Sequence, residues 1–173
     1  MENTIVELKF SLDTFYFLMS GVLVMWMAAG FAMLEAGLVR AKNTTEILTK
    51  NVALFSIACT MFLLVGYNIM YVDNAEGGFI PSFGALIGTQ AADADHSLES
   101  DFFFQVVFVA TAMSIVSGAV AERMKLWAFL IFTVILTGFI YPIEGYWTWG
   151  AGFLSEMGFV DFAGSAIVHG AGA

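Results

Sequence analysis

The chain has 173 residues, of which 60% are hydrophobic and 12% are charged, and its formal net charge is −9. Soluble domains carry about 25% charged residues. This composition and a mean hydropathy of +0.84 therefore exclude an ordinary soluble domain and predict an integral membrane protein. No basic patch is present that could bind nucleic acid, and the single cysteine, Cys59, excludes a disulfide framework.

Apolar stretches divide the chain into five predicted spans. They cover approximately residues 14–38, 52–72, 102–121, 126–142 and 161–173. A spanning helix needs about 20 apolar residues, so the last stretch, with 13 residues, is expected to be a truncated span. Small residues recur in the first and third spans, which is typical of helices that pack closely in a membrane bundle.

The basic residues determine the predicted orientation. Five of the six fall in the links 39–51 and 122–125. The positive-inside rule places both links in the cytoplasm. Alternation then places the N-terminus and the acidic loops 73–101 and 144–160 outside. We expect a multi-pass protein of the plasma or inner membrane.

The last predicted span contains a histidine, His169, and begins at Asp161. An ionisable side chain within a membrane is costly and by default marks a pathway or relay. A buried imidazole stays neutral and can both accept and donate a proton, so His169 is a candidate pore or proton-relay residue. Alternatively, it only hydrogen-bonds a neighbouring helix. Asp161 can cap the helix, support a cation site near its mouth, or do both.

Aromatic side chains lie near the predicted external surface. Trp147 fits the interfacial aromatic belt, where tryptophans at this depth are usual. Trp149, which is followed by glycine, is a candidate inward-facing ring for a desolvated cation. Phe104 and Phe108 are one helical turn apart at the external end of the third span. They either face lipid or core, or line an apolar gate below the tryptophan.

Two glutamates, Glu35 and Glu122, lie near the predicted cytoplasmic ends of the first and third spans. Basic residues follow each of them: Arg40 and Lys42 in one case, Arg123 in the other. Snorkelling or ion pairing at the helix ends explains both, so we assign them structural roles. No nucleophile–base pair, metal-ligand spacing or phosphate loop is present in the sequence, so we expect neither an enzyme nor a cofactor.

Four blocks of the sequence carry a resemblance to a known family. They are Gly30–Gly37 followed by Arg40–Asn43, then Gly118–Arg123, Trp149–Gly152, and Asp161–Ser165 followed by Val168 and His169. In order and spacing they resemble the ammonium transporter family (the Amt/Mep/Rh superfamily) across nearly the whole chain, apart from the acidic loop. The Asp-Phe-Ala-Gly block with its downstream histidine is highly specific. Trp149 favours the Amt/Mep branch over the Rh branch.

The resemblance implies an all-α integral membrane fold. Residues 1–173 would be the N-terminal part of an ammonium transporter domain, the first five-helix repeat of an eleven-helix protomer with inverted repeats. Members of the family usually form homotrimers with a pore in each subunit. Bacterial relatives are typically regulated by a cytoplasmic protein of the PII class.

The resemblance also implies site residues. Trp149 matches the external recruitment site, and Asp161 matches the acidic residue that supports it. Phe104 and Phe108 match the aromatic gate. Both also belong to the recruitment site, and Phe108 closes the pore. His169 matches the first of two pore histidines. The second histidine and the recruitment serine normally come from the other repeat, which this sequence does not contain.

The expected function is transport of ammonium or ammonia across the bilayer. The cation would be captured by the aromatic and acidic site and deprotonated at the phenylalanine gate, and ammonia would pass a histidine-lined apolar pore. Two alternatives remain. One is an ammonium sensor that signals through a domain beyond residue 173. The other is an Rh-like gas channel, against which Trp149 argues.

Overall fold

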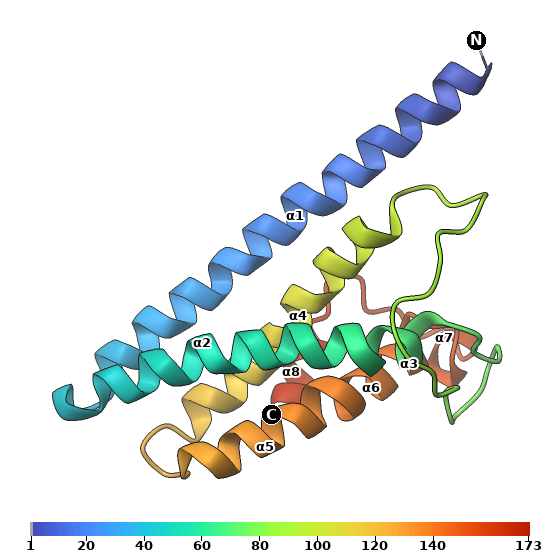
Figure 1. The fold of residues 1–173 in the computed structure, drawn as a ribbon. Coiled ribbons are helices and arrows are strands. Elements are labelled where there is room, and N and C mark those ends of the chain that lie inside the picture. Colours follow the sequence, from blue (N-terminus) through green and yellow to red (C-terminus); the bar gives the residue numbers. More distant parts are fainter. Residues whose placement is uncertain (1) are drawn as a thin grey trace.

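The computed structural model describes residues 2–173, and in that range every regular element is a helix (Figure 1). The α-helices are α1 (Glu2–Leu38), α2 (Thr44–Met61), α3 (Tyr67–Tyr71), α4 (Leu98–Ala119), α5 (Leu126–Ile135), α6 (Tyr141–Thr148), α7 (Phe153–Glu156) and α8 (Ile167–Gly172). Single turns join some of them: η1 (Ala41–Asn43), η2 (Phe62–Gly66) and η3 (Leu136–Ile140). Because η2 and η3 continue the helices on either side, α2–α3 and α5–α6 are each one long rod.

Four of these rods are long and apolar enough to cross a membrane. Their bounds are Thr4–Leu38, Ala41–Tyr71, Leu98–Ala119 and Leu126–Glu156, and they correspond to the first four predicted spans. The rods are longer than predicted; α1 begins at Glu2 rather than near residue 14. The fifth predicted span differs more, since α8 has six residues and begins at Ile167 instead of Asp161.

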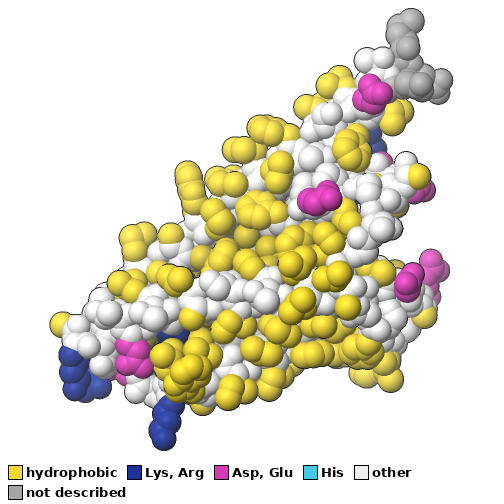
Figure 2. Space-filling model, viewed as in Figure 1, with side chains coloured by type: hydrophobic (Ala, Val, Ile, Leu, Met, Phe, Trp, Pro, Cys, Tyr) yellow, Lys and Arg dark blue, Asp and Glu magenta, His cyan; other side chains and the backbone are white. Residues whose placement is uncertain are grey.

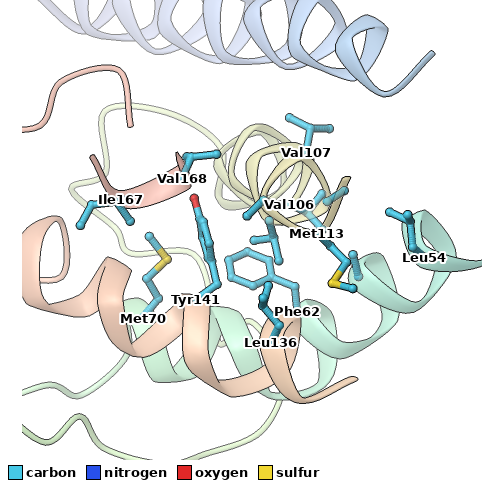
Figure 3. Close-up of a cluster of buried hydrophobic side chains, with 14 of the residues drawn as sticks. Leu54, Phe62, Met70, Val106, Val107, Met113, Leu136, Tyr141, Ile167 and Val168 are labelled. Carbon is cyan, nitrogen blue, oxygen red and sulfur yellow. The ribbon is translucent and has the colours of Figure 1, made fainter. Parts of the chain in front are cut away.

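The central helix of the bundle is α4. Half of its apolar 18-residue stretch is buried inside the bundle. The same share is 6% for α1, which lies along one side of the bundle (Figure 1). The core packs around α4, and Figure 3 shows Phe62, Leu136 and Tyr141 meeting Val106 and Met113 there. In lipid the hydrophobic effect does not drive helices together, so close packing of such side chains holds the bundle together.

Two π-helical turns lie against each other in this core. A π turn holds one residue more than an α turn and is usually a single local insertion. In η2, a Cβ added to Gly66 would lie 3.2 Å from the carbonyl oxygen of Thr137 in η3. In η3, a Cβ on Gly138 would lie 2.8 Å from Cε of Met61. Gly66 therefore allows a close backbone approach between the two turns, whereas a side chain at Gly138 would meet the flexible end of Met61.

The links between rods gather by charge at the two ends. At the basic end, the main-chain amide of Arg40 donates to Oε1 of Glu122 over 2.9 Å, which joins both predicted cytoplasmic links. At the opposite, acidic end, the Gly77 amide donates to the Ala151 carbonyl over 2.8 Å, which joins both acidic loops. Most Lys and Arg atoms visible in Figure 2 lie at the basic end, with an apolar band between the ends.

Glu35 does not pair with the basic residues that follow it in the sequence. Its side chain is 2% exposed, and its Oε2 lies 3.4 Å from Nζ of Lys50 on α2. The Ser117 hydroxyl donates to Oε2 over 2.8 Å, while Lys50 donates to the Ser117 carbonyl over 2.9 Å. Snorkelling is the wrong explanation for Glu35 because α1, α2 and α4 converge here and supply an internal partner. We retain the structural role assigned to Glu35 from the sequence.

Glu122 is held by the opposite link rather than by Arg123. It adopts a left-handed backbone with φ of 60°. Its carboxylate accepts hydrogen bonds from Nδ2 of Asn43 and from the amide and Nε of Arg40. These donors, Asn43 first, lower the pKa of Glu122 from its ordinary 4.5 to about 2. The carboxylate therefore fastens the α1–α2 link to the α4–α5 link.

Candidate functional site

An aromatic cavity of about 490 Å³ lies between α1, α3, α4 and the segments that follow α6. Seven rings line it: Tyr16, Phe17, Tyr71, Phe104, Phe108, Trp149 and Phe162. The remaining lining residues are Ser20, Gln105 and Ala163. The cavity thus brings together three residues that the sequence singled out, although they are separated by up to 45 positions in the chain: Phe104, Phe108 and Trp149.

The two phenylalanines of α4 form a ring pair. The centroids of Phe104 and Phe108 are 5.0 Å apart with an interplanar angle of 75°, the edge-to-face geometry that aromatic pairs prefer. Phe17 of α1 meets Phe104 edge-to-face at 5.1 Å. His96 stacks on Phe17 at 4.3 Å. A continuous run of four rings therefore leads from the acidic loop to Phe108.

Asp161 holds two parts of the site in place. Its main-chain carbonyl accepts the indole N–H of Trp149 over 2.7 Å, which fixes the orientation of that ring. Its carboxylate oxygen Oδ2 accepts the amides of Ala166 and Ile167 over 3.0 and 2.9 Å. The helix start predicted at Asp161 is wrong, because Gly164 (φ 78°) turns the chain first. The carboxylate still satisfies the first amides of α8, as a cap does.

His169 lies on α8, outside the lining of the aromatic cavity. Its neighbours Ile167 and Val168 are buried, whereas His169 itself is exposed on the surface of the described chain. A Cβ added to Gly172 would lie 3.0 Å from the Ala112 carbonyl of α4, so α8 runs close against α4. Ala112 is one turn beyond Phe108, and α8 therefore leads from the cavity toward the middle of the bundle. The buried environment expected for His169 is not found among the described residues.

Trp147 lies outside the aromatic cavity, whereas two polar residues line it. Trp147 stacks on Phe79 at 5.1 Å and donates its indole N–H to the Phe79 carbonyl, away from the cavity. Ser20 and Gln105 line the cavity but were not singled out from the sequence. Their only sequence signal is a polar residue within an apolar span. Within residues 4–173, no three His, Cys, Asp or Glu side chains converge as a metal site.

The fold and the site together define a multi-pass α-helical membrane protein with an aromatic cavity at one end of its bundle. Residues 15–173 match the Ammonium Transporter Family. The chain belongs to that family, as the four sequence blocks implied.

Individual relatives and structures agree with this membership. A putative ammonium transporter of Synechocystis is 43% identical over 172 residues, which is 98% of this chain and 39% of the relative. Ammonium transporter Amt2 of Archaeoglobus fulgidus is 39% identical, covering 92% of this chain and 36% of the relative. The chain therefore spans about two fifths of the length of these relatives.

Solved structures show the same fold. A structure described as a sensor Amt protein superposes with a TM-score of 0.88 at 32% identity, over 99% of this chain and 43% of that chain. Mep2 of Saccharomyces cerevisiae superposes with a TM-score of 0.79 at 23% identity, over 95% of this chain and 40% of that chain, and supports the fold alone. The predicted class, an all-α membrane protein built as the N-terminal part of an Amt/Mep fold, is confirmed.

Proposed function

We propose that the protein moves ammonium or ammonia across the membrane and that the aromatic cavity captures the cation. The observation that carries the proposal is the convergence of Trp149, Phe104 and Phe108 on one cavity at the acidic end. A ring face attracts a desolvated cation by up to about 2 kcal/mol. The indole N–H of Trp149 is already bonded to Asp161, so the ring offers the cavity its π surface rather than its donor.

Ring contacts alone do not carry an intact cation further. A charge at the bilayer centre costs about 3 to more than 10 kcal/mol, whereas one ring returns about 2 kcal/mol, so a ring pair offsets only the low end of that cost. We therefore place deprotonation at the Phe104–Phe108 pair, with Phe108 as the gate. Ammonia then moves along an apolar pore, and the proton takes a separate route through His169. Transport by this mechanism is electrogenic.

The position of α8 supports a role for His169 in that route. Gly172, three residues after His169, lies close against Ala112, one turn beyond Phe108 on α4, and this supports a place for His169 near the proposed gate. His169 is exposed on a face that needs further protein around it to become a pore. The family usually supplies that protein from the second repeat and assembles as a homotrimer, and we propose both for the full-length protein. The protein would lie in the cell membrane with its basic end facing the cytoplasm. A PII-type regulator would bind at that end.

The test is electrophysiology on the full-length protein in lipid bilayers. Wild type should give an ammonium-dependent current, Trp149→Leu should raise the KM for ammonium, and His169→Ala should lose the current or its selectivity. Ser56→Ala, whose hydroxyl bonds its own helix at Val52, is the matched control. If His169→Ala keeps both current and selectivity, the proton route through that residue is refuted.

A second candidate function is ammonium sensing. The observation that favours it is the TM-score of 0.88 with the sensor Amt protein. A sensor would bind ammonium in the same cavity and change its affinity for a cytoplasmic partner without passing a current. Ligand-dependent partner binding in the absence of flux would therefore replace the transport proposal with this one. An Rh-like gas channel is the third possibility, and Trp149 argues against it.

A further inference from the structure

The hydroxyl of Ser20 on α1 belongs to the lining of the aromatic cavity and has been given no role so far. Ser20 lines the cavity and is half-buried. Hydroxyls elsewhere in the bundle bond the carbonyl one turn earlier in their own helix, as Thr111 and Ser114 do over 2.8 and 3.0 Å. Ser20 donates no such bond within residues 4–173. Its hydroxyl therefore remains available to the contents of the cavity.

A second polar side chain, that of Gln105, lines the same cavity from α4. The side-chain amide of Gln105 donates through Nε2 to Oδ1 of Asp101 over 3.3 Å. An ionised carboxylate can only accept, so the NH₂ group must point toward Asp101 and the carbonyl oxygen Oε1 must point away from it. Asp101 is itself fixed by the Tyr67 hydroxyl, which donates to Oδ2 over 2.6 Å. The orientation of the Gln105 amide follows from this chain of bonds.

We propose that Ser20 and Gln105 are specificity-determining residues of the cavity, which bind a small cation bearing N–H donors through Ser20 Oγ and Gln105 Oε1. This inference rests on the proposed function and assigns a division of labour within it. The rings attract positive charge of any shape. The two oxygens replace water molecules that the cation loses, and they do so only for a cation that can donate hydrogen bonds.

The chemistry separates ammonium from cations of equal charge that lack N–H groups. Ammonium has four donors, and a hydrogen bond to a charged group is worth more than one between neutral groups. Tetramethylammonium carries the same charge but has no N–H, so it engages the rings alone. Removing an oxygen should therefore weaken ammonium binding and leave tetramethylammonium binding unchanged.

The experiment uses the full-length protein in proteoliposomes. Ser20→Ala and Gln105→Leu should each raise the KM for ammonium about tenfold. Tetramethylammonium, measured as a competitor, should keep its inhibition constant in both variants. Ser20→Thr, which keeps a hydroxyl, should retain the wild-type KM. Ser56→Ala, whose hydroxyl bonds within its own helix, is the control for loss of a serine elsewhere.

The possible results separate this inference from the function on which it rests. If wild type neither transports nor binds ammonium, the proposed function fails. If wild type transports but both variants keep its KM, the inference about Ser20 and Gln105 is overturned and the function stands. A parallel loss of both ligands means a structural role and also overturns it. Should tetramethylammonium not compete in wild type, the comparison of Ser20→Ala with Ser20→Thr decides.

Discussion

The buried ion pair between Glu35 and Lys50 gives a sharp test of what holds the basic end of the bundle together. The side chains are 2% and 7% exposed, and Oε1 of Glu35 already lacks a hydrogen-bond partner among the described residues. Lys50→Met removes the ammonium group and leaves the carboxylate buried beside apolar atoms. Breaking one side of such a pair costs about 3–5 kcal/mol, because the remaining charge is uncompensated.

The double variant Glu35→Leu/Lys50→Met should behave differently. It removes both charges at once, and replacing a buried pair by apolar groups is often neutral or stabilising. Ser117 would lose its carboxylate acceptor, but its hydroxyl can turn to the carbonyl one turn earlier, as that of Ser114 does. We therefore expect the double variant to recover most of the stability that Lys50→Met loses.

The measurement is the thermal unfolding midpoint of the purified full-length protein in detergent. It is compared for wild type, Glu35→Leu, Lys50→Met and the double variant. Lys9→Met removes an ammonium group whose ion pair with Asp95 is exposed, and it serves as the control with little expected change. A Lys50→Met protein as stable as the control would refute the reasoning. So would a double variant that is less stable than Lys50→Met.

Three further predictions concern single side chains. Tyr141→Phe should not lower the unfolding midpoint, because the buried hydroxyl has no partner among the described residues; Tyr146→Phe should cost about 1 kcal/mol, since its hydroxyl bonds a loop carbonyl over 2.7 Å. The stability that wild type has over Glu122→Gln should be full above pH 4.5 and should vanish as pH falls to about 2, because the folded pKa is lowered; midpoints of both proteins across that range test this sign. Phe17→Ala loses three ring contacts, with Tyr16, His96 and Phe104, and His96→Ala loses one, so calorimetry should find Phe17→Ala the more destabilised by about 1–3 kcal/mol; equal losses would contradict the run of rings.

The helical rods were predictable because hydropathy reports them directly. A run of about 20 apolar residues without charges has few alternatives in a membrane, so the existence of the first four spans followed from the sequence. Their ends did not. The helix α1 continues well before residue 14, because helical hydrogen bonds persist outside the hydrocarbon, where the hydropathy signal ends.

The sequence singled out three residues that line the aromatic cavity, but it did not indicate how the surrounding helices pack. The spacing of Phe104 and Phe108 placed both rings on one helix face, and the cavity brings them to Trp149. No local pattern indicates that Lys50, at the predicted cytoplasmic end of one helix, would reach Glu35 on another. Such a pairing depends on how helices pack. The oxygen of Ser20 was missed for the same reason.

The paired π turns η2 and η3 have a consequence for which mutations the chain can tolerate. Each holds one extra residue, and in an α-helix each residue adds about 100° of rotation. Because the extra residue is absorbed within the turn, deleting one residue from η2 would give an ordinary α turn and leave the residues after it on their present faces. Tyr67 and Met70, now buried, would still face the core, whereas a deletion inside α2, which has no extra residue to lose, would turn them away by that angle. Deep mutational scanning should therefore find single-codon deletions tolerated better within η2 than within the α-helical turns of α2 that precede it.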